Sequence, residues 1–300
     1  HTALRRQRQM CIRDRYNASH QLTAIGTDSY QYDDNGSMTM RSVTPGVQQH
    51  FDYDIRGRLS QVTNQSDNGD GTVTESTVAT YQYDPFGRRI SKTVDGVISY
   101  FLYGQNGLMA EYNASGNAIR EYDYWPGSLW GTNPVYLKHE SEHYYYHNDH
   151  IGTPQALSNS QGQIVWRAEY DAFGLSTIIQ KSINNPLRYP GQYHDNETGL
   201  HYNYFRFYDP SLGRYIRRDP LGLFGGLNPY TYVMNNPFVF IDPYGLFLCD
   251  ALGLLGGTSL GLGVSGGLGI AGGIDLGLSS SVISLTGTRG VGGGLAGTDN

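Results

Sequence analysis

Tyr81-Gln82-Tyr83-Asp84-Pro85-Phe86-Gly87-Arg88 contains a pattern that recurs along the chain, and this pattern indicates the fold. An aromatic residue, any residue, Tyr, Asp and then a Gly turn also appear in Tyr30-Gln31-Tyr32-Asp33-Asp34-Asn35-Gly36 and in Phe51-Asp52-Tyr53-Asp54-Ile55-Arg56-Gly57-Arg58. Weaker copies follow at residues 103–107, 122–124 and 169–174. Copies spaced by about 20 to 30 residues indicate a structural repeat.

Each repeat predicts one β-hairpin. Two aromatic residues separated by one position place their rings on the same face of a strand. The Asp ends the strand, because its side chain accepts hydrogen bonds from backbone N–H groups of the turn, and the Gly supplies the positive φ that the turn needs. Alternating polar and apolar residues then begin the return strand. One hairpin alone is marginally stable, so we expect the hairpins to stack into a long, curling antiparallel sheet.

The composition agrees with an all-β fold. The chain of 300 residues contains 25 Tyr and 40 Gly, with 38% hydrophobic and 16% charged residues. Such a composition disfavours helices and favours short strands joined by tight turns. The net charge of −6 gives no broad basic surface, so we expect no binding of nucleic acid. Two cysteines, Cys11 and Cys249, are too few for a disulfide framework.

Motifs downstream of the repeats are more specific. They include Leu187-Arg188-Tyr189-Pro190-Gly191-Gln192-Tyr193, Arg206-Phe207-Tyr208-Asp209-Pro210 and Asp242-Pro243-Tyr244-Gly245-Leu246. Together with the repeats, these motifs resemble the YD-repeat or Rhs-repeat family, which includes bacterial Rhs toxins, toxin-complex B and C components, and teneurins. The resemblance covers residues from about 16 to 246, and its C-terminal part is similar to the Rhs-associated core.

The resemblance implies a hollow shell, or cocoon, in which the spiralling hairpin sheet encloses a C-terminal toxin and the core plugs the end. On this basis we divide the chain into a repeat shell at 16–180, the core at 181–246 and a variable, Gly-rich segment at 247–300. Residues 1–15 are basic and fit nothing downstream. We interpret them as a sequence artefact, or else as a linker, and exclude them from the reasoning on fold.

Two Asp-Pro steps, Asp219-Pro220 and Asp242-Pro243, are the candidates for chemistry. Two carboxylates that share a site cannot both ionise cheaply, so such a pair can act as acid and base on an amide. The alternative is structural, because Asp-Pro also opens turns. We interpret a third step, Asp209-Pro210, as such a turn.

The family resemblance implies aspartyl-type self-cleavage just after the Asp-Pro-x-Gly-Leu motif, here between Leu246 and Phe247. Gly245 would let the backbone approach the carboxylates. Arg218, or else Arg217, would orient a carboxylate or stabilise the developing oxyanion. Family members often carry Ser where Arg217 stands, which leaves open which Arg assists.

Other constellations are weaker. His143, His147 and His150 are enough for a metal site by count, but we interpret them as hydrogen-bonded hairpin and turn residues, so no metal and no cofactor is expected. Aromatic pairs such as Tyr202 with Tyr204 suit either sugar binding or cross-strand packing.

The tail after Leu246 changes character. Residues 247–300 are about one third Gly, far above average usage. Three interpretations stay open: the start of a toxin cargo, which we favour by position, a Gly-spaced β-rich or membrane-interacting segment, and a flexible linker. No strongly apolar run of about 20 residues predicts a membrane-spanning helix.

The sequence therefore predicts a fragment of a bacterial toxin-delivery shell that releases a C-terminal effector by autoproteolysis and is secreted or delivered at the cell surface. Its expected partners are its own upstream repeats and cargo, a secretion spike or toxin-complex component, and an immunity protein. The alternative is a cell-surface adhesion or carbohydrate-binding repeat protein without proteolytic activity.

Overall fold

The computed structural model describes residues 14–246 and 249–250, and these lie in one compact unit. Sixteen strands form one antiparallel sheet, here called the long sheet, in which the strands follow one another in chain order. They are β1 (Asp14–Tyr16), β2 (Leu22–Ile25), β3 (Asp28–Tyr32), β4 (Met38–Thr44), β5 (Val47–Tyr53), β6 (Leu59–Asp67), β7 (Val73–Tyr83), β8 (Arg89–Val94), β9 (Val97–Gly104), β10 (Gly107–Asn113), β11 (Ala118–Tyr124), β12 (Pro134–His139), β13 (Glu142–Asn148), β14 (Pro154–Ser158), β15 (Ile164–Tyr170) and β16 (Ser176–Lys181).

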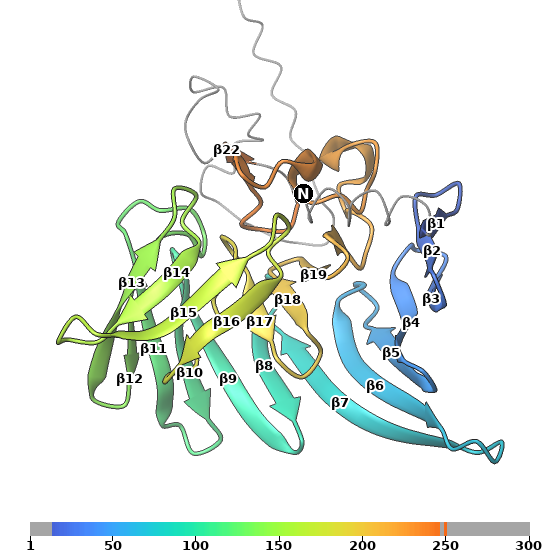
Figure 1. Cartoon of the computed structure of the whole chain (residues 1–300), viewed down its shortest axis with the longest axis horizontal. Coiled ribbons are helices and arrows are strands. Elements are labelled where there is room, and N and C mark those ends of the chain that lie inside the picture. Colours follow the sequence, from blue (N-terminus) through green and yellow to red (C-terminus); the bar gives the residue numbers. More distant parts are fainter. Residues whose placement is uncertain (1–13, 247–248, 251–300) are drawn as a thin grey trace, which may run out of the picture. The chain divides into compact units, whose positions relative to one another are not determined.

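A second sheet, here called the core sheet, follows in the chain. It contains β17 (Tyr193–Asp195), β18 (Leu200–Asn203), β19 (Arg206–Asp209) and β20 (Arg214–Tyr215). Two short 3₁₀ turns follow, η1 (Gly222–Gly225) and η2 (Val233–Asn235), and then the two-stranded pair of β21 (Phe240–Ile241) with β22 (Cys249–Asp250). The prediction of an all-β fold built from stacked hairpins is confirmed (Figure 1).

The repeat turns form as their residues predict. In the repeat at 81–88, Asp84 Oδ1 accepts a hydrogen bond of 2.9 Å from the Arg88 N–H, and the Gly87 N–H donates to the Asp84 carbonyl at 3.1 Å. Gly87 has a φ of 89°, which an L side chain rarely adopts. The same two hydrogen bonds close the turns that begin at Asp33 and Asp54.

The tyrosines of the repeat connect neighbouring hairpins. The first aromatic position is buried, as at Tyr81, and contributes to the core between the sheets. In the copies at 51–58 and 81–88, the hydroxyl of the second Tyr donates to a carbonyl of an earlier strand: Tyr53 to Met38 at 2.8 Å and Tyr83 to Leu59 at 2.6 Å. A register shift precedes this Tyr in the copies at 30–36, 51–58 and 81–88, for example between Gln82 and Tyr83. Such bulges bend a strand, which accounts for the curvature of the long sheet in Figure 1.

The core sheet packs against the buried face of the long sheet. Apolar residues from both sheets form one continuous cluster. Buried ion pairs join the sheets as well: Arg89 with Asp195, and Arg41 with Asp209, both at 2.5 Å. Asp209 thus opens a turn, as predicted, through its bond to the Ser211 N–H, and it also joins the two sheets. The domain boundaries at 180/181 and 246/247 stay predictions, and the second lies at the edge of the described residues.

Candidate functional site

Asp219 and Asp242 come from different segments and both lie in the interior. Asp219 follows strand β20 and is 3% exposed; Asp242 follows strand β21 and is 2% exposed. Each carboxylate uses Oδ1 to close its own turn: Asp219 accepts from the Leu221 N–H at 2.8 Å, and Asp242 accepts from the Leu246 N–H at 2.9 Å. The turn-forming role that Asp-Pro steps usually have is therefore present at both positions.

The second oxygen of each carboxylate reaches the same guanidinium. Arg206 Nη2 lies 2.9 Å from Asp219 Oδ2 and 3.3 Å from Asp242 Oδ2. The Arg206 side chain is 2% exposed, and its Cζ lies 3.6 Å from the centre of the Tyr215 ring. The structure therefore brings the two predicted carboxylates together, with Arg206 as a bridge that the sequence analysis did not assign.

The two carboxylates of this group have different electrostatic surroundings. Burial raises the pKa of Asp219, Arg206 opposes that rise, and the neighbouring Asp242 adds to it. Asp242 has a second donor at Oδ2, because the Tyr215 hydroxyl donates to it at 2.7 Å. Hydrogen bonds to a carboxylate stabilise its charged form. The two acids thus have different surroundings, which is the arrangement that acid–base chemistry needs.

The backbone next to the predicted cleavage position is held by the same residues. Gly245 has a φ of 67°, and a Cβ there would overlap the Asn203 carbonyl, so the close approach requires glycine. The Gly245 carbonyl accepts a hydrogen bond from Arg206 Nε, and the Leu246 N–H is held by Asp242. Phe247 lies outside the described residues. Beyond it, Cys249 pairs with Ile241.

The two arginines predicted as helpers make hydrogen bonds to other segments of the chain. Arg217 Nη1 donates to the Gly57 carbonyl at 2.5 Å, and the Arg218 N–H donates to the Gly36 carbonyl at 3.2 Å. Both residues therefore contact the turns of the first repeats, and burial lowers the pKa of Arg217. Their catalytic roles stay predictions, but Arg206 is the arginine that touches both carboxylates. No spacing rule singles it out, since it lies in a strand, 36 positions from Asp242.

A surface pocket of about 540 Å³ lies beside this group. It is lined by Asp219, Pro220, Arg217 and Arg218, and by the turns at 33–37 and 53–57. Asp219 thus lines a pocket that opens at the surface.

The remaining candidates have structural contacts. His147 Nε2 is hydrogen bonded to Ser158 Oγ at 2.9 Å, and His150 Nε2 to the Phe238 carbonyl at 2.8 Å. In the part of the chain that the structure describes, no group of three or more His, Cys, Asp or Glu is placed to hold a metal ion. Tyr202 is buried against Phe207, with ring centres 5.5 Å apart. Among the described residues, no helix is long and apolar enough to cross a membrane.

A long sheet of Tyr-Asp hairpins that packs on a core sheet defines a YD-repeat shell protein. The family model for the teneurin YD-shell matches residues 3–237. The chain therefore belongs to the teneurin YD-shell family, as its motifs indicate.

Curated relatives and solved structures agree with this assignment. The chain is 33% identical over 254 residues to the double-stranded DNA deaminase toxin A of Burkholderia cenocepacia, covering 75% of this chain and 17% of that protein. It is 32% identical over 263 residues to the toxin protein Tse5 of Pseudomonas aeruginosa, covering 77% of this chain and 20% of that protein. The chain thus spans about a fifth or less of these relatives.

Among solved structures, the Photorhabdus luminescens Tc holotoxin pore carrying the TccC3-D651A mutation matches with a TM-score of 0.52 and 20% identity. The match covers 79% of this chain and 15% of that one. The crystal structure of TcdB2-TccC3 matches with a TM-score of 0.51 and 23% identity, over 73% of this chain and 14% of that one. At this identity the likeness concerns the fold alone.

Proposed function

We propose that the chain is part of a toxin-delivery shell that hydrolyses its own backbone between Leu246 and Phe247 and so releases the segment that follows. The observation that carries this proposal is the buried pair of Asp219 and Asp242 on one guanidinium, with the Leu246 N–H bonded to Asp242. Two relatives that match about three quarters of this chain are named as toxins, which supports the delivery role.

The reaction consumes one water. Asp242 accepts a proton from the water, whose oxygen attacks the Leu246 carbonyl carbon, while Asp219 donates its proton to the Phe247 nitrogen as the C–N bond breaks. The products are a carboxylate at Leu246 and an amine at Phe247. This division of roles follows the surroundings, because burial raises the pKa of Asp219 above that of an ordinary aspartate, which favours it as the acid of the pair. Asp242 accepts from Tyr215 and Leu246 and serves as the base.

Arg206 is a positioning residue in this scheme. It contacts both carboxylates through Nη2 and the Gly245 carbonyl through Nε, so it fixes the acids relative to the backbone that enters the scissile bond. Fixed geometry of this kind accounts for much of the rate that intramolecular reactions gain. The pocket beside Asp219 supplies a route for water.

Intact mass spectrometry of the 300-residue chain tests the proposal. We expect the wild type to give two pieces cut after Leu246, and the Asp219→Asn and Asp242→Asn variants to stay whole. Asp149→Asn is the matched control, because Asp149 closes a hairpin turn through the Ile151 and Thr153 N–H groups. A folded wild type that stays intact, or unchanged cleavage in Asp242→Asn, would overturn the proposal.

The cargo, the upstream repeats, a secretion spike or toxin-complex component and an immunity protein are the partners that this function requires. The expectation that nucleic acid is not a partner stays a prediction, because relatives include a protein named as a tRNA nuclease, WapA of Bacillus subtilis. Delivery outside the producing cell follows from the proposed role and is part of the proposal.

A further inference from the structure

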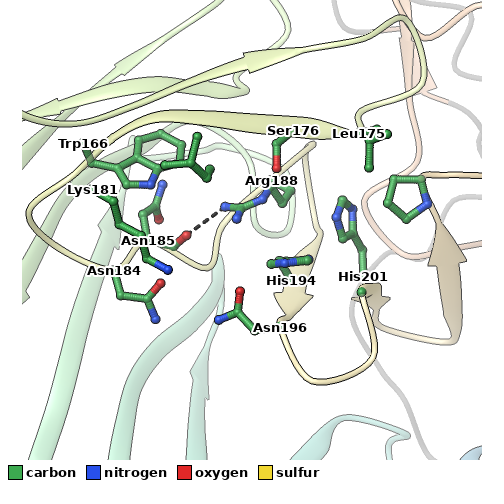
Figure 2. Close-up of a pocket in the computed structure, with 13 residues that line it drawn as sticks. Trp166, Leu175, Ser176, Lys181, Asn184, Asn185, Arg188, His194, Asn196 and His201 are labelled. Atoms are coloured by element: carbon green, nitrogen blue, oxygen red, sulfur yellow. Dashed lines mark hydrogen bonds between the residues drawn. The ribbon is translucent and has the colours of Figure 1, made fainter.

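A second polar pocket lies away from the aspartate pair, between the last strands of the long sheet and the start of the core sheet. It has a volume of about 160 Å³ and is shown in Figure 2. Strands β15 and β16 supply Trp166 and Lys181, the connection after β16 supplies Asn185 and Arg188, and strands β17 and β18 supply His194 and His201. None of the described residues that line it is an Asp or a Glu. The Lys and Arg side chains of the lining, Lys181 and Arg188, are therefore not balanced by a carboxylate of the same lining.

Arg188 is the central residue of this pocket. It is 4% exposed, and its Nη1 donates to the backbone carbonyls of Asn185 and Leu187, each at 2.8 Å. Its Cζ lies 5.7 Å from the centre of the Trp166 ring. Among the described residues, no carboxylate lies within ion-pair distance of Arg188, whereas the buried Arg89 has Asp195. A buried cation without a counter-charge is costly, and burial accordingly lowers the pKa of Arg188.

Several buried nitrogen atoms at this pocket have no hydrogen-bond partner. They are Arg188 Nε, Asn185 Nδ2 and His194 Nδ1. The orientation of the Asn185 amide is fixed, because its Oδ1 accepts from the Tyr146 hydroxyl at 2.9 Å and from the Leu187 N–H at 3.2 Å. Its amide nitrogen is therefore left as a donor without a protein acceptor. Buried donors in native proteins nearly always have a partner, so these atoms call for one.

We propose that this pocket binds a small oxyanion, a phosphate or a carboxylate group, held by Arg188 and the Asn185 amide, with Lys181 at the exposed rim. The planar guanidinium and the amide are the donors that recognise such groups, and the anion supplies the charge that Arg188 lacks. The volume suits a small group, since pockets for drug-sized molecules measure about 300–1,000 Å³. Water would satisfy the donors but would not neutralise the cation.

Isothermal titration calorimetry on the 300-residue chain tests this site, with inorganic phosphate and acetate as probes in a chloride buffer of matched ionic strength. We expect one saturable site for at least one of the two probes, and the stronger of the two identifies the preferred group. Arg188→Gln should weaken binding at least tenfold, and Lys181→Gln a few-fold. Lys138→Gln removes a partly exposed cation of strand β12 that lines neither pocket, and it is the control that should bind like the wild type.

Asn196→Asp keeps the test decisive if Arg188→Gln does not fold. Asn196 lines the pocket and is exposed, so the new carboxylate adds a negative charge at the rim without being buried. We expect it to weaken binding of the anion several-fold. The proposal is overturned if neither probe shows saturable binding to the wild type, if chloride competes equally well, or if Asn196→Asp and Lys181→Gln both bind like the wild type.

Discussion

Replacement of Arg206 by Gln should destabilise the folded chain strongly, because Arg206 is the shared counter-charge of Asp219 and Asp242. All three side chains are 2–3% exposed, so the variant leaves two carboxylates buried at one place. Breaking a buried pair by removing one partner costs about 3–5 kcal/mol. The carbonyls of Gly245 and Pro229 also lose a donor. We therefore expect a loss of about 3–5 kcal/mol in the free energy of unfolding at neutral pH.

Urea denaturation followed by tryptophan fluorescence measures this loss. Arg58→Gln is the matched control, because it breaks an ion pair of 2.6 Å whose side chains are 21% and 25% exposed. Pairs of that kind contribute about 0–1 kcal/mol. The double variant Arg206→Gln with Asp219→Asn should recover part of the loss, since one of the two carboxylates is then neutral, and contacting residues couple by about 0.5–3 kcal/mol.

A loss of unfolding free energy in Arg206→Gln that is no larger than the loss in Arg58→Gln would contradict this prediction. Full additivity of Arg206→Gln and Asp219→Asn would do so as well, because two residues that share an ion pair cannot act independently.

Three further predictions concern glycine geometry and pH. Gly245→Ala should cost more stability than Gly116→Ala in the same denaturation assay, and it should slow cleavage. Both glycines have a positive φ (67° and 78°), but of the two only Gly245 has other atoms within 4 Å of the position that a Cβ would take. Burial raises the pKa of Asp219 above its usual 3.8, so the folded state holds that proton more tightly, and the contribution of Asp219 to stability falls as pH rises from about 4 through the raised pKa. The stability of Asp219→Asn relative to the wild type should therefore increase over that pH range. A constant difference between the two proteins would contradict the raised pKa. Burial, together with Arg188, lowers the pKa of His194 from 6.5 to about 4, so the contribution of neutral His194 to stability is complete above pH 6.5 and is lost as pH falls toward 4. His194→Asn should reduce the loss of stability between these pH values by up to about 3 kcal/mol. An unchanged pH dependence of stability in urea titrations would show that the imidazole is not desolvated.

The repeat turns were predictable from the sequence because their contacts are local. Asp84 bonds the backbone four residues later and Gly87 adopts its positive φ within the same turn, so pattern and geometry coincide. The bulge before each second Tyr was not predictable, since it depends on the register between neighbouring strands.

The candidate site was only half predictable. The Asp-Pro steps were recognised, and the structure places Asp219 and Asp242 together. Arg206 was missed because a buried arginine in a strand has no signal of its own. It begins β19, is followed by the buried Phe207 and Tyr208, and meets Asp242 across 36 positions. The arginines adjacent to Asp219 in sequence instead contact the turns at Gly36 and Gly57.

The hairpin, its aromatic face and its turn follow from the amino-acid sequence, because each depends on residues within one strand-turn-strand unit. The pairing of the buried charges does not follow from it, because the core sheet packs across the long sheet and joins segments distant in sequence. Three outcomes follow from that packing: Arg89 meets Asp195, Arg206 meets two carboxylates, and Arg188 meets none among the described residues. A buried charge takes whichever partner the surrounding strands bring to it.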